Sequence, residues 1–170
     1  MKKKFDLKKE GILFWVTGLQ GSGKTTISKK IKNKIEKLYG KTLFFDGDIL
    51  RNIFDLNDYS EEGRLKLDAS YSKFCQHIVK SKINLIFATV SMNHKIREYN
   101  KKKYHNYFEI YIRRKKLFRK KSRVNIFKLI SKDKVELPKN SDITVSNNSN
   151  INLAVKKIIS KIKKININDK

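Results

Sequence analysis

The chain has 170 residues and a formal charge of +25, from 41 lysines and arginines against 16 aspartates and glutamates. A single proline and a single cysteine, Cys75, exclude collagen-like, proline-rich and disulfide-stapled chains. The apolar runs are too short to cross a bilayer, and the basic N-terminal stretch lacks the cleavage site of a secretory signal. We therefore expect a single cytoplasmic domain over residues 1–170.

Short apolar runs alternate with amphipathic stretches along the chain, as is typical of α/β proteins. In chain order, the predicted elements are a strand over 11–17, a helix over 24–39, a strand over 42–45, a helix over 61–80, strands over 84–90, 108–112 and 143–145, and a helix over 151–162. The helix over 61–80 carries an apolar stripe that we expect in the core, formed by Leu67, Tyr71, Phe74 and Ile78. Strands separated by helices need crossovers, so we predict a three-layer α/β fold with a five-stranded parallel sheet and helices on both faces.

The segment 113–140 breaks this alternation. It is dense in lysine and arginine, its apolar residues are scattered, and it contains the only proline, Pro138. A solvated loop has this composition. So does a basic lid that opens and closes over a bound nucleotide, because lids are drawn from weakly packed segments.

The strongest motif is GLQGSGKTT at residues 18–26, which matches the phosphate-binding pattern G-x-x-x-x-G-K-[ST] between a predicted strand and a predicted helix. Glycines let the backbone N–H groups turn toward phosphate oxygens, and the start of the following helix adds attraction. Lys24 is placed to reach the β- and γ-phosphates, and the Thr25 hydroxyl to join the Mg²⁺ shell. The predicted nucleotide-binding residues are Gly18, Gly21, Ser22, Gly23, Lys24, Thr25 and Thr26.

Acidic residues follow the second predicted strand, where Asp46 and Asp48 precede Arg51. The carboxyl ends of parallel strands face the crevice in which ligands bind. One carboxylate there can hold a Mg²⁺-bound water while the other orients or deprotonates an acceptor hydroxyl. An Asp-Gly turn that caps the next helix is the structural alternative. The third strand is followed by Ser91, where many ATPases carry an aspartate.

Together, G-x-L-x-G-S-G-K-T-T and D-G-D-x-x-R resemble the adenylylsulfate kinase family of P-loop nucleotide kinases, and the similarity continues through YSEEGR at 59–64 and ELP at 136–138. In that family, ATP phosphorylates the ribose 3′-hydroxyl of a nucleotide whose 5′-phosphate bears a second acidic group. The resemblance implies catalytic roles for Lys24, Asp46 and Asp48, and a magnesium site at Thr25 and Asp46. It also implies a set of substrate-binding residues, namely Asp48, Arg51, Tyr59, Arg64, Ser91 and Arg97.

The chain departs from the family at positions that recognise substrate. Leu67 stands where the family usually has asparagine, and Ser91 is followed by Met-Asn-His instead of Pro-Phe-Arg. The lid motif is contracted to RKKLF at 114–118, and the family's Phe-Thr-Gly-Ile-Asp is IFKLI at 126–130. This pattern resembles the divergent branch linked to capsular polysaccharide modification. The branch implies cytidine diphosphoramidate as the first candidate acceptor, with adenylylsulfate as the alternative.

The net charge also suggests a nucleic-acid-stimulated ATPase. However, the basic residues are mostly lysine, whereas base recognition relies on arginine, so we favour a solvated surface. A nucleotide-binding module without transferase activity is a third alternative, which the intact Lys24, Thr25, Asp46 and Asp48 disfavour. The predicted partners are ATP with Mg²⁺ and an acidic nucleotide, with no specific nucleic acid and no membrane, and a homodimer is left open.

Overall fold

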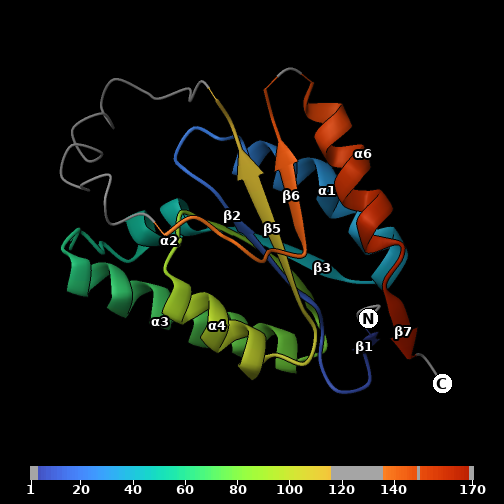
Figure 1. The fold of residues 1–170 in the computed structure, drawn as a ribbon. Coiled ribbons are helices and arrows are strands. Elements are labelled where there is room, and N and C mark those ends of the chain that lie inside the picture. The colour runs from blue at the N-terminus through green and yellow to red at the C-terminus, as the bar shows by residue number, and fades with distance from the viewer. Residues whose placement is uncertain (1–3, 116–135, 149, 169–170) are drawn as a thin grey trace.

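The computed structural model describes residues 4–115, 136–148 and 150–168. Its centre is a five-stranded sheet in the order β3-β4-β2-β5-β6, parallel at every pairing (Figure 1). The strands are β2 (Leu13–Thr17), β3 (Thr42–Asp46), β4 (Asn84–Thr89), β5 (Tyr107–Arg113) and β6 (Ile143–Ser146). The predicted α/β class and parallel sheet are confirmed.

Helices cover both faces of the sheet, α1 and α6 on one face and α3 and α4 on the other (Figure 1). The helices are α1 (Lys24–Tyr39), α2 (Gly47–Ile53), α3 (Glu61–Lys80), α4 (His94–Lys103) and α6 (Ile151–Ile162). The helices expected over 24–39, 61–80 and 151–162 have these bounds in the structure. The short helices α2 and α4 were not predicted, and α4 lacks an apolar stripe because its buried residues are Arg97 and Asn100.

The core is divided by the sheet, and β2 contributes to both halves through its alternating side chains. Phe14 and Val16 pack into the cluster that includes the isoleucines of α1, while Leu13 and Trp15 pack toward α3. Trp15 stacks on Phe87 of β4 with ring centroids 5.3 Å apart. All five residues of β2 are buried, as expected for the central strand of a covered parallel sheet.

A two-stranded parallel sheet, not predicted from the sequence, joins the two ends of the chain. It pairs β1 (Lys4–Asp6) with β7 (Asn166–Asn168). Phe5 of β1 is fully buried in the α1–α6 half of the core. The side chain of Asn106 fixes this region, because its Nδ2 donates to the backbone oxygens of Asp6 and Glu10 at 2.8 and 2.7 Å.

The topology gathers the carboxyl ends of the strands at one edge of the sheet, which Figure 1 shows on the side toward α2 and the start of α1. The chain crosses from β4 to β5 over β2, so the order of strands reverses at β2, and ligands of such folds bind at this switch point. Among the described helices, none has both the length and the apolar composition of a membrane span.

Candidate active site

The loop between β2 and α1 has the backbone that its glycines predict. Gly21 and Gly23 have φ angles of +79° and +100°, which residues with a Cβ rarely adopt. A Cβ on Gly23 would also lie 2.3 Å from Nδ2 of Asn147, which follows β6. Asn147 donates from this atom to the Ser22 backbone oxygen at 2.9 Å. The loop is therefore held in shape from the opposite side by a residue distant in sequence.

Lys24 begins α1 and bends back over the loop. Its Nζ donates to the backbone oxygens of Gly18 and Leu19 at 2.9 and 3.2 Å. Burial lowers the pKa of the Lys24 ammonium to about 8, against the opposing effect of the Asp48 and Asp46 carboxylates. An incompletely hydrated cation beside backbone N–H groups is suited to gain an anionic ligand, because phosphate oxygens would replace the lost water.

Asp46 links the loop to the acidic segment. It is the last residue of β3 and the N-cap of α2, and its Oδ1 accepts from the Asp48 backbone N–H at 3.0 Å. Its Oδ2 accepts from the Thr25 hydroxyl at 2.5 Å. The capping alternative is thus correct for Asp46, and it does not exclude the chemical one, because the second carboxylate oxygen faces the loop.

The Thr25 hydroxyl and the Asp46 carboxylate form an all-oxygen donor pair that fits Mg²⁺. In the part of the chain that the structure describes, no group of three or more histidine, cysteine, aspartate or glutamate side chains is placed to hold a metal. Mg²⁺ differs from metals that need such a cage, because it usually binds one or two protein oxygens together with substrate phosphates and waters.

The start of α3 brings further predicted residues to the same edge. Ser60 caps the helix by accepting from the Gly63 backbone N–H at 3.0 Å. The carboxyl group of Asp58 fills the space beside Gly63, where a Cβ would approach it to 2.2 Å. These contacts place Arg64 in the first turn of α3.

Three predicted substrate residues have buried polar atoms that lack partners. They are Nη1 of Arg51, Nε of Arg64 and the hydroxyl of Ser91, none of which has a hydrogen-bond partner among the described residues. The guanidinium carbon of Arg51 lies 4.4 Å from the centre of the Tyr59 ring, a cation–π contact. Unpaired buried N–H groups are unfavourable without a partner, so these donors are suited to the anionic oxygens of a ligand.

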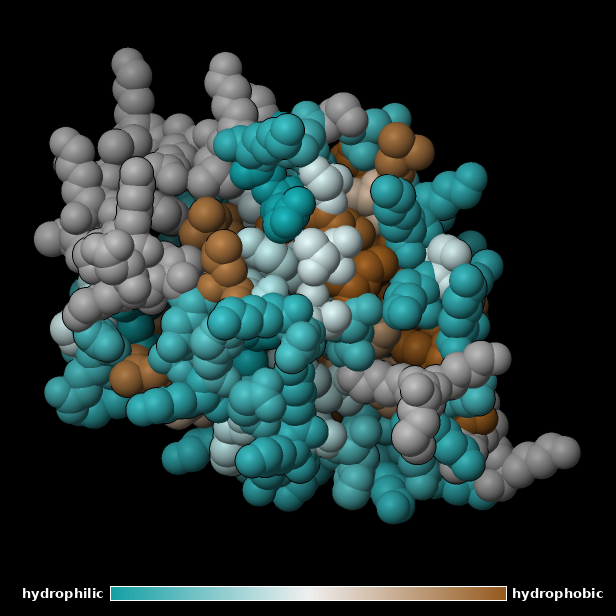
Figure 2. Space-filling view, viewed as in Figure 1, coloured by the Kyte–Doolittle hydropathy of each residue, from teal (hydrophilic) through white to brown (hydrophobic). Residues whose placement is uncertain are grey.

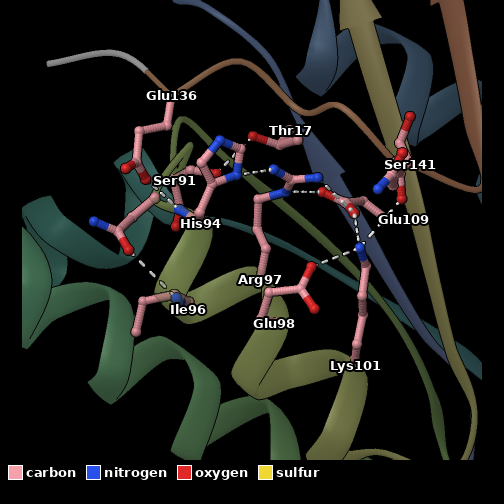
Figure 3. A network of polar contacts seen from close by, with 12 residues as sticks. Thr17, Ser91, His94, Ile96, Arg97, Glu98, Lys101, Glu109, Glu136 and Ser141 are labelled. Atoms are coloured by element: carbon pink, nitrogen blue, oxygen red, sulfur yellow. Dashed lines mark hydrogen bonds and ion pairs between the residues drawn. The ribbon is translucent and has the colours of Figure 1, made fainter.

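Arg97, by contrast, does not present unpaired N–H groups at this edge of the sheet. It is 1% exposed, and its guanidinium bonds both oxygens of Glu109, which is fully buried on β5 (Figure 3). Its Nη1 also lies 2.9 Å from Nδ1 of His94. A buried carboxylate on a central strand requires a cation, and Arg97 supplies it. Its expected direct contact with substrate therefore has no support in this placement.

The network around Arg97 fixes the segment that precedes β6. Glu136 accepts from the His94 backbone N–H at 2.5 Å (Figure 3). Lys101 Nζ donates to the Asn140 backbone oxygen at 3.2 Å. The C-terminal end of the expected lid over 113–140 is thus docked on α4. Residues 116–135 of that lid lie outside the described part of the chain.

A cavity of about 230 Å³ lies beside the loop, at the ends of β5 and β6. Leu19 closes one side, and Arg113, Arg114 and Lys115 contribute cationic side chains. The other lining residues are Tyr111, Ile112, Leu137, Ser146 and Asn148. Its mixture of apolar and cationic groups next to the phosphate-binding loop suits the base and ribose of a nucleotide.

The distribution of the lysines is the one expected of a solvated surface. Hydrophilic side chains predominate among the described residues at the lower part of the face shown in Figure 2, below a central area of neutral and apolar residues. On α1, the exposed Lys30 and Lys34 alternate with the buried Ile27, Ile31 and Ile35, so lysine occupies the outer side of an amphipathic helix.

Two residues of the site were missed from the sequence. Asn147 carries no motif, and only the fold reveals that it contacts the loop. Asp68 lies on α3 between the core residues Leu67 and Tyr71, but near Arg64, Arg51 and Ser91. Its spacing of four residues from Arg64 was the available signal, since such pairs share a helix face.

Known proteins share both the fold and the motifs. A cytidine diphosphoramidate kinase from Campylobacter jejuni is 37% identical over 106 residues, 62% of this chain and 62% of that protein. An adenylyl-sulfate kinase from Clostridium kluyveri is 33% identical over 86 residues, 50% of this chain and 43% of that protein. The chain thus spans less than two thirds of either relative's length.

The Mycobacterium tuberculosis APS kinase, solved with AMPPNP and APS, has the same fold, with a TM-score of 0.69 at 18% identity over 91% of this chain and 98% of that chain. The family model for adenylylsulphate kinase matches residues 10–146, which is most of the chain. The chain belongs to the adenylylsulphate kinase family.

Proposed function

We propose that the protein transfers the γ-phosphate of Mg·ATP to the ribose 3′-hydroxyl of an acidic nucleotide conjugate. The observation that carries this proposal is the arrangement at one sheet edge. A phosphate-binding loop with its lysine lies beside Asp46 and Asp48, and arginines with unpaired buried N–H groups lie next to them. Two anionic ligands fit this edge, a nucleoside triphosphate and an acidic acceptor.

On the donor side, the loop N–H groups and Lys24 bind the β- and γ-phosphates. Lys24 exchanges its two carbonyl contacts for phosphate oxygens. Thr25 and Asp46 would hold the magnesium, which would supply positive charge to neutralise the transferring phosphoryl group. The nucleoside of ATP enters the cavity beside Leu19, where Arg113 and Arg114 supply cations to its base.

On the acceptor side, Asp48 orients the 3′-hydroxyl and takes its proton. The bond from O3′ to the γ-phosphorus forms as the bond from that phosphorus to the β,γ-bridging oxygen breaks, and ADP leaves. Asp48 is suited to this role because it lies in the first turn of α2, two residues after β3, and its charge acts on Lys24.

Arg51 and Arg64 bind the 5′-phosphate groups of the acceptor, and Tyr59 stacks on its base. The Ser91 hydroxyl completes this site. Arg97 acts indirectly, because it holds the start of α4 through its contact with His94. These residues bind an acidic nucleotide, and stacking alone does not select its base.

Cytidine diphosphoramidate is the acceptor we favour, because the relative from Campylobacter jejuni carries that name and the substrate shell departs from the adenylylsulfate pattern at Leu67. Its product would belong to capsule modification. Adenylylsulfate is the alternative, supported by the relative from Clostridium kluyveri.

The test is ADP release from Mg·ATP with each acceptor in parallel. We expect cytidine diphosphoramidate to give the higher kcat/KM. A higher kcat/KM with adenylylsulfate would reverse the assignment, and no stimulation of ADP release by either would contradict the proposed function.

A further inference from the structure

The half-buried carboxylate of Asp68 lies beside the proposed acceptor site and has no role in the phosphoryl transfer described above. It is on α3, four residues after Arg64, and faces the charges of Arg64 and of Arg51 on α2. Tyr71, three residues further along α3, donates to the Gly47 backbone oxygen at 2.5 Å and lies in the field of both Asp68 and Asp48. Asp68 is therefore part of the same edge of the sheet as the reacting groups.

The Asp68 carboxylate has no ion-pair partner among the described residues. Among the described residues, no ion pair joins it to Arg51 or Arg64, although both are close enough to favour its charged form. The Ser91 hydroxyl also favours the ionised carboxyl, although its oxygen has no hydrogen-bond partner among the described residues. Burial dominates, and it raises the pKa of Asp68 to about 6.

The neighbouring unpaired atoms on Arg51, Arg64 and Ser91 favour a ligand that completes this cluster. Ser91 is 7% exposed, and its hydroxyl lies unpartnered beside Asp68. Nη1 of Arg51 and Nε of Arg64 are buried and unpartnered as well. The two arginines supply donors for anionic oxygens, whereas an ionised carboxylate only accepts hydrogen bonds. A ligand that satisfies all of them has anionic oxygens and, close to them, an N–H group.

We infer that Asp68 determines acceptor specificity, its carboxylate accepting a hydrogen bond from an N–H group of the acceptor nucleotide. The inference rests on the proposed function and deepens it by naming the class of acceptor. In cytidine diphosphoramidate, the amide nitrogen on phosphorus supplies an N–H group that adenylylsulfate lacks, whereas both nucleotides carry an exocyclic amine on the base. A terminal sulfate carries only acceptor oxygens, which the carboxylate would repel.

The test measures binding by calorimetry with AMPPNP in the donor site, so that it does not depend on turnover. The probes are cytidine diphosphoramidate, uridine diphosphoramidate, which lacks the base amine, and CDP, which lacks the phosphorus-bound nitrogen. The variant is Asp68→Asn, of nearly equal size. Glu62→Gln is the matched control, since Glu62 lies on the exposed side of the same helix and pairs with Lys66.

We expect Asp68→Asn to weaken cytidine diphosphoramidate binding by about 10- to 100-fold, the effect of losing a hydrogen bond to a charged group, and Glu62→Gln to leave it unchanged. The analogue that lacks the contacting N–H group should bind wild type weakly and lose nothing further in Asp68→Asn, which identifies the nitrogen. Equal losses with all three probes, equal binding by variant and wild type, or no binding to wild type would overturn the inference. Tight binding to wild type without ADP release from Mg·ATP would contradict the proposed function alone.

Discussion

Asp68→Asn should make the ligand-free protein more stable while it weakens substrate binding. Burial raises the pKa of Asp68 from its ordinary value of 3.8 to about 6. At 1.36 kcal/mol per pKa unit, this shift corresponds to about 3 kcal/mol by which the ionised carboxyl destabilises the folded state. The side chain keeps some exposure, and asparagine is also partly desolvated in its place, so we expect a gain of about 1 to 2 kcal/mol in the free energy of unfolding.

The pH dependence of this gain follows from the raised pKa. Above pH 6 the carboxyl is charged in both folded and unfolded chains, and the penalty is complete. As the pH falls from 6 to 3.8, the folded state takes up its proton first and the penalty disappears. Arg51 and Arg64 are the charged groups that face Asp68. The stability difference between variant and wild type should therefore be largest at neutral pH and vanish near pH 4.

Urea unfolding followed by circular dichroism, without nucleotides, measures this difference at pH 7.5 and pH 4.5. Titration of every other group occurs in both proteins and cancels in the comparison. A destabilised variant at pH 7.5, or a gain in stability that does not change with pH, would refute the reasoning, because either result would show that Asp68 is not a desolvated carboxylate in the folded chain.

Other substitutions separate the roles of the site. Asp48→Asn should lower kcat by about 10²- to 10⁴-fold, the contribution of a general base, with little effect on ATP affinity; loss of ATP binding with unchanged turnover would contradict its assignment. Gly23→Ala should strongly weaken ATP binding measured by calorimetry, because the φ angle of +100° disfavours any residue with a Cβ and the added Cβ would displace the Asn147 side chain; wild-type affinity would show that the loop does not need this backbone conformation. Arg97→Met should lower the free energy of unfolding by about 3 to 5 kcal/mol, because it leaves the buried Glu109 with only Lys101 as a cationic partner, at 3.9 Å. Arg97→Met combined with Glu109→Leu should regain much of that loss, and a single variant of wild-type stability with a raised KM would instead favour direct substrate contact.

The sequence predicted the sheet and the long helices because their burial produces regular patterns. A central strand buried on both faces is a continuous apolar run, as in β2, and α1 has isoleucines at helical spacing. Helix α4 escaped prediction because it buries Arg97 and Asn100, whose partners come from other elements. The pairing of β1 with β7 escaped for a related reason, since it joins opposite ends of the chain.

The part of the site that follows a sequence motif was predictable. The glycine loop, Lys24, Thr25 and the acidic pair lie at fixed spacings, and the fold brings them together at one edge. Residues on rigid elements could not be assigned in this way, because their role depends on what the fold places opposite them. Arg97 meets Glu109 and is buried with it, whereas Asp68 meets unpaired donors and lacks an ion pair of its own.

The central claim, transfer of phosphate to a ribose 3′-hydroxyl, is tested most directly by mass spectrometry of the acceptor after incubation with Mg·ATP. The account predicts that cytidine diphosphoramidate gains one phosphoryl group, and that its 3′-deoxy analogue binds but gains none. Phosphorylation of the 3′-deoxy analogue, or ADP formation with no phosphorylated acceptor of either kind, would contradict it.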